Sequence, residues 1–319
     1  MIYHELSCFS GFRCIAGACP DTCCAGWEID LDDRAIDRYA RMPGPLGEEL
    51  REAMTREGEY TFFALRQGRC PFLSGENLCR LILGAGEACL SETCRSHPRF
   101  WADFGDLRET ALGISCPEAA RLLLTEPLQM VETADGVPGD PDPELDRRLL
   151  RLLLEMRGKL LDLCLEPLPL SARMGAVLET ARVYDGLLLR WDAGERVTVP
   201  EPVISETLLL PEMPAFLRAL GEMELTDGRL PELLARRREQ DPDAPGDPGG
   251  RLLYYFLYRY ALRGVWDGWL YEKLAFSVYA AAVILSLPGD LTAAAAVFCR
   301  ETEHSEENLT ALFRALRLG

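Results

Sequence analysis

Basic residues, and lysine in particular, are scarce in this sequence of 319 residues. Lys159 and Lys273 are its only lysines, and 34 basic residues stand against 51 acidic ones, which gives a formal net charge of −17. A chain of this charge repels the phosphate backbone of nucleic acids and the surface of anionic membranes. We therefore expect no general nucleic-acid binding, and cationic partners suit the chain better.

Long apolar runs and an export signal are also missing. The longest apolar stretch, residues 275–287, is well short of the ~20 residues that a membrane-spanning helix needs. The opening MIYHELSCFSGF has no basic start followed by an apolar core and a cleavage site, so it does not predict a secretory signal. We therefore expect a cytoplasmic protein without a membrane-inserted segment.

Several motifs that hold nucleotides or support hydrolysis are absent. The sequence contains no G-x-G-x-x-G after a strand, no phosphate-binding Gly-Lys-Ser/Thr loop, no G-x-S-x-G elbow and no H-E-x-x-H pair. The C-x3-C-x2-C loop of radical S-adenosylmethionine enzymes also fails, because Gly26 stands where a third cysteine should follow Cys19 and Cys23. A Rossmann-type or radical S-adenosylmethionine site is therefore unsupported.

Cysteine, in contrast, is abundant, and ten of the twelve cysteines fall within the first 116 residues. A disulfide framework explains such a density in a short secreted chain, but this chain has no export signal and enough further residues to build a core. In a reducing compartment the same density favours metal or redox chemistry.

The candidate metal ligands lie in two stretches. The first is the segment CIAGACPDTCC, whose glycine and proline let the chain turn back so that its thiolates converge. The second begins at the CPFL element and adds four more cysteines. The eight candidates are Cys14, Cys19, Cys23, Cys24, Cys70, Cys79, Cys94 and Cys116.

Eight thiolates suffice for one site with spares or for two complete sites, because zinc and iron–sulfur clusters each take four cysteines. Adjacent side chains diverge in extended backbone, so Cys23 and Cys24 either serve different metals or include a spectator. The remaining cysteines are predicted to be small buried hydrophobic residues, namely Cys8, Cys89, Cys164 and Cys299.

The sequence predicts a mainly α fold: a small irregular cysteine-rich metal-binding domain, residues 1–134, followed by an all-α helical domain, residues 135–319. The boundary falls in the segment DGVPGDPDP, which is rich in turn residues. A second such segment, residues 240–250, predicts a surface loop, and strand-like alternation is scarce apart from residues 196–205.

Apolar periodicity and capping residues predict the helices. In the first domain they span residues 32–42, 46–55 and 117–124, and the last of these has Pro117 in its first turn. In the second domain they span residues 144–165, 171–191, 214–223, 231–239, 251–263, 270–285, 291–300 and 305–316.

Four segments of the sequence resemble the bacterial flagellin lysine-N-methylase family: FRCIAGACPDTCCAGWEIDLD, CPFLSGENLC, LSETCRSHPRF and ISCPEAARL. The stretches YYFLYRY and ETEHSEEN extend the resemblance over nearly the whole chain. The N-terminal half is also similar to zinc- or iron–sulfur-binding cysteine-cluster proteins, through its CC pair and its C-P-F-L and C-R-x-x-P elements.

The resemblance implies methyl transfer from S-adenosylmethionine to the lysine ε-amino groups of flagellin. It also implies an iron–sulfur cluster, of the 4Fe-4S type with zinc as the alternative, held by the eight cysteines named above. It names no contacts to S-adenosylmethionine and no oligomeric state. A non-catalytic metal-binding or redox module with a partner-binding helical domain is the alternative that the cysteine spacing supports equally.

The closing motif ETEHSEEN contains two catalytic candidates, Glu303 and His304. Histidine has a pKa near neutrality, so His304 is suited to take a proton from an incoming lysine or to position it, while Glu303 holds the ammonium. The alternative is that both residues belong to a helix junction capped by Ser305.

An aromatic-rich helical region is a candidate lining for a lysine channel, because rings attract cations. The alternative is that these rings are packing residues of the helices. They are Tyr254, Tyr255, Tyr258, Tyr260, Trp266, Trp269 and Tyr271.

Overall fold

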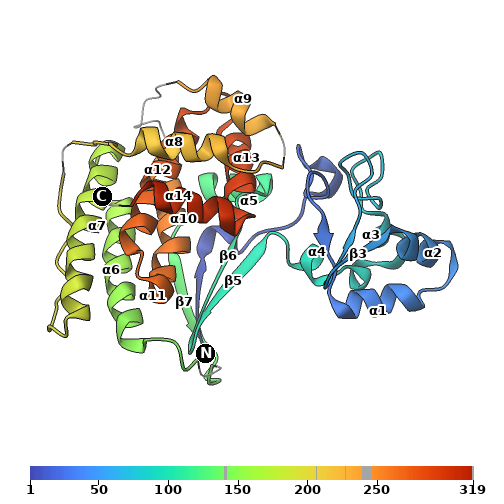
Figure 1. The fold of residues 1–319 in the computed structure, drawn as a ribbon, viewed down its shortest axis with the longest axis horizontal. Coiled ribbons are helices and arrows are strands. Elements are labelled where there is room, and N and C mark those ends of the chain that lie inside the picture. Colours follow the sequence, from blue (N-terminus) through green and yellow to red (C-terminus); the bar gives the residue numbers. More distant parts are fainter. Residues whose placement is uncertain (140–141, 206, 227, 239–245, 318–319) are drawn as a thin grey trace.

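The structure is a computed structural model that describes residues 1–139, 142–205, 207–226, 228–238 and 246–317. It has two lobes: a large one in which helices cover a four-stranded sheet, and a small one built between Phe12 and Arg99 (Figure 1). Each lobe has its own core of buried apolar residues.

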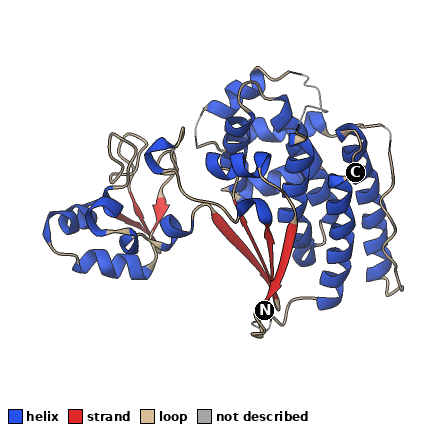
Figure 2. Cartoon of the chain, turned by 180° about the vertical axis from the view of Figure 1, so that it is seen from behind, coloured by secondary structure: helices blue, strands red, loops and turns tan. Residues whose placement is uncertain are grey.

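The sheet of the large lobe contains both ends of the first 134 residues. Its strands are β1 (Ile2–Leu6), β5 (Arg99–Phe104), β6 (Leu107–Leu112) and β7 (Met130–Ala134), in the order β5-β6-β1-β7. β1 runs parallel to β6, with Ile2 opposite Leu107, and antiparallel to β7. The small lobe is therefore an insertion between two strands of the large lobe, as Figure 2 shows.

Because the small lobe is inserted, the two hydrophobic cores are not separated at the predicted domain boundary after residue 134. Residues before the small lobe, such as Leu6, and after it, such as Phe104 and Leu123, belong to the core of the helical lobe. β1 and β7 were not predicted, because they pair with each other, and β1 with β6, across most of the first half of the chain. The β5–β6 hairpin is local, with Phe104 opposite Leu107, and was also missed.

The mainly α character is confirmed, and in the second half every described element is a helix. The helices of the large lobe are α5 (Pro117–Thr125), α6 (Arg147–Leu165), α7 (Leu170–Asp192), α8 (Met213–Glu222), α9 (Arg229–Ala235), α10 (Pro248–Tyr260), α11 (Gly264–Asp267), α12 (Leu270–Ser286), α13 (Leu291–Glu303) and α14 (Glu306–Ala315).

The apolar run at residues 275–287 lies in α12, which packs against α7 and α10 and is buried on nearly all sides. A helix that is apolar all round belongs in the centre of a core. Among the described residues, no helix combines the length and the apolar character that a membrane crossing requires.

In the helical half, one local pattern did not form the element that it resembles, and one predicted loop ends earlier than expected. Residues 196–205 pair with no strand and run as irregular chain between α7 and α8. Residues 248–250 begin α10 instead of ending a loop, because Asp247 caps that helix by accepting the backbone N–H of Gly250. Residues 240–245 of the expected loop lie outside the described part of the chain.

The small lobe combines a three-stranded sheet with short helices. Its elements are β2 (Ile29–Asp30), β3 (Met54–Glu57), β4 (Tyr60–Phe63), α1 (Asp33–Arg41), α2 (Gly44–Ala53), α3 (Arg80–Ala85) and α4 (Glu92–Ser96). The side chain of Asp32 caps α1 and also accepts the backbone N–H of Glu92, so one carboxylate fixes two helices. In its core Tyr39 stacks on Phe63, and Phe63 meets Phe72 edge to face.

A buried ionic network joins the sheet of the large lobe to its helices. Arg157 of α6 is 1% exposed and donates to Glu109 of β6 at 2.7 and 2.5 Å. Glu109 also contacts His4 of β1, whose other ring nitrogen contacts Glu132 of β7. Burial alone would raise the pKa of Glu109, because it disfavours the charged carboxylate. The charges and hydrogen bonds of Arg157 and His4 have the larger effect and hold this pKa below its usual value.

We predict that Arg157→Met lowers the free energy of unfolding by about 3–5 kcal/mol, because it leaves the Glu109 carboxylate buried without its countercharge. Urea unfolding measures the change. Arg148→Met is the matched control, since Arg148 is exposed on the same helix, and its effect should stay within about 0.5 kcal/mol. A loss below about 1 kcal/mol for Arg157→Met would contradict the structural role of the network.

Candidate functional site

The eight candidate thiols do not all lie in one place: some lie where the two lobes meet, and others belong to or pack against the core of the small lobe. Seven of them belong to the small lobe, while Cys116 begins α5 of the large lobe. All twelve cysteines of the chain are free thiols, so none of them is in a disulfide.

The first group of thiols, called set one, consists of Cys14, Cys19, Cys23 and Cys116. Burial raises the pKa of Cys116, and the charges of Cys19 and Cys14 raise it further. Burial likewise raises the pKa of Cys19, with a further contribution from Cys14. The pKa of Cys23 is raised mainly by its hydrogen bond with the Cys24 thiol, then by burial and by neighbours that include Cys14 and Cys116.

The second group, set two, consists of Cys24, Cys70, Cys79 and Cys94. Burial raises the pKa of Cys70 to about 12, with contributions from Cys24, Cys94 and Cys79. Burial raises the pKa of Cys94 to about 11, and Cys24 and Cys79 add to the effect. The backbone N–H of Cys70 donates to the carbonyl of Cys24 at 2.8 Å, which holds the two loops of this set together.

Cys23 and Cys24 are the point at which the two sets touch. The hydrogen bond from the neighbouring Cys23 thiol is the main reason why the pKa of Cys24 falls to about 7. Beyond this mutual contact, Cys23 interacts with Cys14 and Cys116, whereas Cys24 interacts with Cys70 and Cys94.

Backbone amides surround several of these sulfurs. Burial raises the pKa of Cys116, whereas hydrogen bonds from the backbone N–H groups of Ala119 and Glu118, in the first turn of α5, lower it in part. The amides of Ile82 and Leu81 do the same for Cys79 at the start of α3. Amide dipoles that point at a sulfur favour its thiolate, which is the form that ligates metal.

In number and chemistry, each set matches a four-cysteine zinc or iron–sulfur site. Within the described residues, however, no three histidine, cysteine, aspartate or glutamate side chains are gathered closely enough to hold a metal ion as they stand. The thiols influence one another's ionisation, but they have to draw together to share a metal.

His304 lies beside set one, in a cluster of rings contributed by both lobes. It follows α13, and its Nε2 atom is 2.8 Å from the hydroxyl of Ser115, the residue before Cys116. Its ring stacks on Trp27 at 5.7 Å and on His97 at 6.2 Å. The indole N–H of Trp27 in turn donates to the carbonyl of Cys23.

Both histidines of this cluster are neutral at pH 7. Burial lowers the pKa of His97 to about 4, helped by the charges of His304 and Arg300. Burial also lowers the pKa of His304 to about 4, although the residue keeps exposed surface, and Arg259 and Arg300 contribute. Nε2 of His97 is buried and has no hydrogen-bond partner among the described residues.

Glu303 faces away from this cluster into the core of the large lobe. Its side chain is 1% exposed, lies 3.2 Å from Nε of Arg259 and accepts a 2.8 Å hydrogen bond from Tyr260. Arg259 is itself stacked over Phe100. The structure therefore brings His304, and not Glu303, to the junction of the lobes.

Five of the seven aromatic candidates are buried in the helical core, namely Tyr254, Tyr255, Tyr258, Tyr260 and Tyr271. Their hydroxyls serve internal contacts in several cases; that of Tyr258 donates to the carbonyl of His4 and that of Tyr254 accepts the backbone N–H of Met130. Trp266 is exposed and Trp269 is half-buried. This placement agrees with packing roles for the five tyrosines.

Sequence reasoning missed Asp21, Trp27, His97 and Ser115 as members of the site. Asp21 forms ion pairs with Arg229 and Arg300, both at 2.9 Å, and so ties the first cysteine loop to α9 and α13. The only signal in the sequence was that each of these residues stands close to a candidate cysteine.

We predict that His97 and His304 titrate near pH 4, well below the ordinary value of about 6.5. The unfolded chain then binds protons that the folded imidazoles do not, so stability should fall as pH drops from about 6.5 to 4. NMR titration measures the imidazoles, with His97→Gln and His304→Gln for assignment. Titration of both rings near pH 6.5 would show that the cluster is not desolvated.

Comparison with known proteins identifies relatives with flagellar and methylase names. The chain is 30% identical over 124 residues to the flagellar biosynthetic protein FliU of Salmonella muenchen. The aligned region covers 36% of this chain and 73% of FliU. It is equally similar over 124 residues to the lysine-N-methylases of Salmonella typhimurium and Salmonella choleraesuis, of which it spans 31%.

No family profile and no solved structure matches the chain. The match nevertheless covers 73% of FliU at 30% identity, which is enough to establish homology. The lysine-N-methylases match at the same level of identity. The chain therefore belongs to the flagellin lysine methylase family.

Proposed function

We propose that this chain N-methylates lysine side chains of flagellin, with S-adenosylmethionine as the methyl donor. The proposal is supported by the kinship with proteins named lysine-N-methylase. The structural observation that points to particular residues for this reaction is the ring cluster of His304, Trp27 and His97, to which both lobes contribute.

The reaction requires a neutral amine in line with an electrophilic methyl group, which S-adenosylmethionine supplies when bound. The lysine nitrogen forms a bond to the methyl carbon as the carbon–sulfur bond breaks, and the products are methyl-lysine, S-adenosylhomocysteine and one proton. The task of the protein is to orient the amine and to receive or release that proton.

His304 is suited to orientation and not to proton removal. With a pKa of about 4 it is a weak base toward an ammonium whose ordinary pKa is about 10.4. As a neutral ring it accepts a hydrogen bond from the substrate amine if the Ser115 contact gives way. The indole of Trp27 beside it offers a cation–π surface for the charged form.

Glu303 acts through the helix that carries His304. Its carboxylate is held by Arg259 and Tyr260, and this fixes the end of α13 from which His304 projects. We therefore assign Glu303 as a positioning residue in place of an ammonium-binding one.

The eight cysteines are the proposed metal ligands, with a 4Fe-4S cluster preferred over zinc. Set one includes Cys116 from the large lobe and three cysteines from the small lobe, so a metal there would cross-link the lobes. Such a link would hold Trp27 and His97 against His304. Free thiols of this number suit the reducing cytoplasm, which is the compartment that we propose.

Co-expression with flagellin tests the activity, and intact-mass spectrometry of flagellin reports the methyl groups added. We predict that His304→Ala keeps its fold and metal content but loses about tenfold or more of the methylation, because the amine is no longer oriented. Glu307→Ala is the matched control, since Glu307 is exposed on the next helix. Wild-type methylation by His304→Ala would remove this residue from the mechanism.

The second candidate function is a non-catalytic metal-binding module, and the two groups of thiols that affect one another's ionisation favour it independently of any methyl transfer. Calorimetry with S-adenosylmethionine on metal-replete protein separates the two functions. Absence of both binding and flagellin methylation in the wild-type chain would favour the module.

A further inference from the structure

The strand β5 forms a free edge of the four-stranded sheet. It pairs with β6 on one side, and in the described part of the chain no strand pairs with its other side. Figure 1 shows this edge on the side of the sheet that is nearest to the small lobe. A free edge presents a row of unpaired backbone N–H and C=O groups, which is a template for one further strand.

The hydrogen bonds of the neighbouring strands identify the residues of β5 that face this edge. The N–H of Ile2 donates to the carbonyl of Asp106, so every second residue of β6 counted from there points its backbone groups at β1. The intervening residues of β6 bond to β5, where the register sets them opposite even-numbered residues. The odd-numbered residues therefore point their N–H and C=O groups outward, and these groups form no hydrogen bond with a described residue. They are Arg99, Trp101 and Asp103.

The charged side chains on this edge are already engaged within the chain. The guanidinium of Arg99 lies over the ring of Phe12 at 5.2 Å, and Asp103 accepts two hydrogen bonds from Arg108 of β6 at 2.6 and 2.7 Å. Natural sheet edges are usually protected by lysine, proline or a bulge, and β5 contains no lysine or proline and pairs with β6 in an unbroken register. The edge is therefore open to a partner strand.

The opposite edge of the sheet, β7, is partly covered. Its residue Met130 donates its backbone N–H to the hydroxyl of Tyr254 on α10 at 2.9 Å. A helix of the large lobe thus takes the place of a neighbouring strand there. This difference selects β5 as the edge at which a polypeptide can be added.

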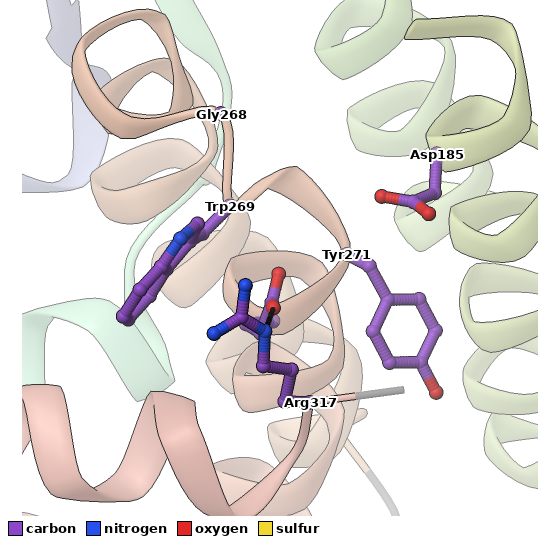
Figure 3. Close-up of a pocket in the computed structure, with 6 residues that line it drawn as sticks. Asp185, Gly268, Trp269, Tyr271 and Arg317 are labelled. Atoms are coloured by element: carbon purple, nitrogen blue, oxygen red, sulfur yellow. Dashed lines mark ion pairs between the residues drawn. The ribbon is translucent and has the colours of Figure 1, made fainter. Parts of the chain in front are cut away.

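Trp101 is a large exposed ring in the middle of the β5 edge. It is 51% exposed and contacts no other ring and no cation among the described residues. Trp266, in contrast, stacks on Phe104, and Trp269 lies beside the guanidinium of Arg317 (Figure 3). Tryptophan is enriched among the residues that contribute most to binding. Trp101 therefore adds a side-chain contact to the backbone groups of this edge.

We propose that β5 binds an extended, lysine-bearing segment of flagellin as an added strand; this inference rests on the proposed function. β5 begins two residues after His97, so a strand on this edge continues toward the ring cluster. With a rise of about 3.3 Å per residue, partner residues just beyond the level of Arg99 lie beside that cluster. A second copy of the chain fits less well, because each copy has a net charge of −17, which disfavours self-pairing and favours a lysine-bearing partner.

Binding of labelled, unmethylated flagellin peptides to the full, metal-replete chain tests the proposal, with fluorescence anisotropy as the readout. Trp101→Pro should weaken binding about tenfold, because it removes an outward N–H and leaves the hydrogen bonds to β6 in place. Trp101→Val is the matched control, since it keeps the N–H and loses only the ring, and it should weaken binding less. Equal affinity of Trp101→Pro and wild type, or an equal loss in the two variants, would overturn the proposal.

Peptides with methylated backbone nitrogens test strand addition itself. An added strand presents alternate N–H groups to β5 and turns the others away. Backbone methylation of one alternate set should therefore weaken binding about tenfold or more, while methylation of the other set should leave the affinity nearly unchanged. Equal effects of the two sets would show that the peptide is not bound as a strand.

The outcomes separate this inference from the proposed function. Strand-like binding of the peptides without any methylation would refute the proposed function and still support the strand site. Methylation of flagellin by Trp101→Pro with unchanged kcat and KM would refute the strand site alone. A wild-type dimer that Trp101→Pro converts to monomers in sedimentation would assign the edge to a second copy and overturn the proposal. Thermal unfolding confirms that both Trp101 variants fold.

Discussion

Contact between the two lobes at set one is the constraint on which the candidate site depends. The small lobe is inserted between β1 and β5, so the chain crosses between the lobes twice. Cys116 of the large lobe faces cysteines of the small lobe, and Asp21 adds ion pairs to Arg229 and Arg300. Only with this contact in place do Trp27 and His97 reach His304.

Burial has opposite consequences for the two kinds of titratable group at the junction. It raises the pKa of most of the thiols and so keeps them protonated until an amide dipole or a metal favours the thiolate. It lowers the pKa of His97 and His304 and so keeps the rings neutral. A junction of neutral rings and protonated thiols brings no unpaired charge out of water, which lets the lobes close on each other.

The sequence was sufficient for the parts of the structure that local rules control. Pro117 opens α5 as predicted, and the apolar spacing located the helices after residue 144. Pairing over long distances was not accessible: β1 finds its partner β6 across the whole inserted lobe. For the same reason the ring cluster and the buried pairing of Glu303 with Arg259 had no signature in the sequence.

Our central proposal is that the eight cysteines form two four-ligand sites, which meet at Cys23 and Cys24. Iron, zinc and sulfide contents of anaerobically purified wild type, Cys23→Ser and Cys24→Ser test it most directly, with Cys164→Ser as the control because Cys164 is buried in the helical core. Each of the two adjacent substitutions should remove the metal of one site and leave the other site loaded, while the control keeps the wild-type content. Loss of all metal in one of the two variants, with full retention in the other, would contradict the division and indicate a single site with a spectator cysteine.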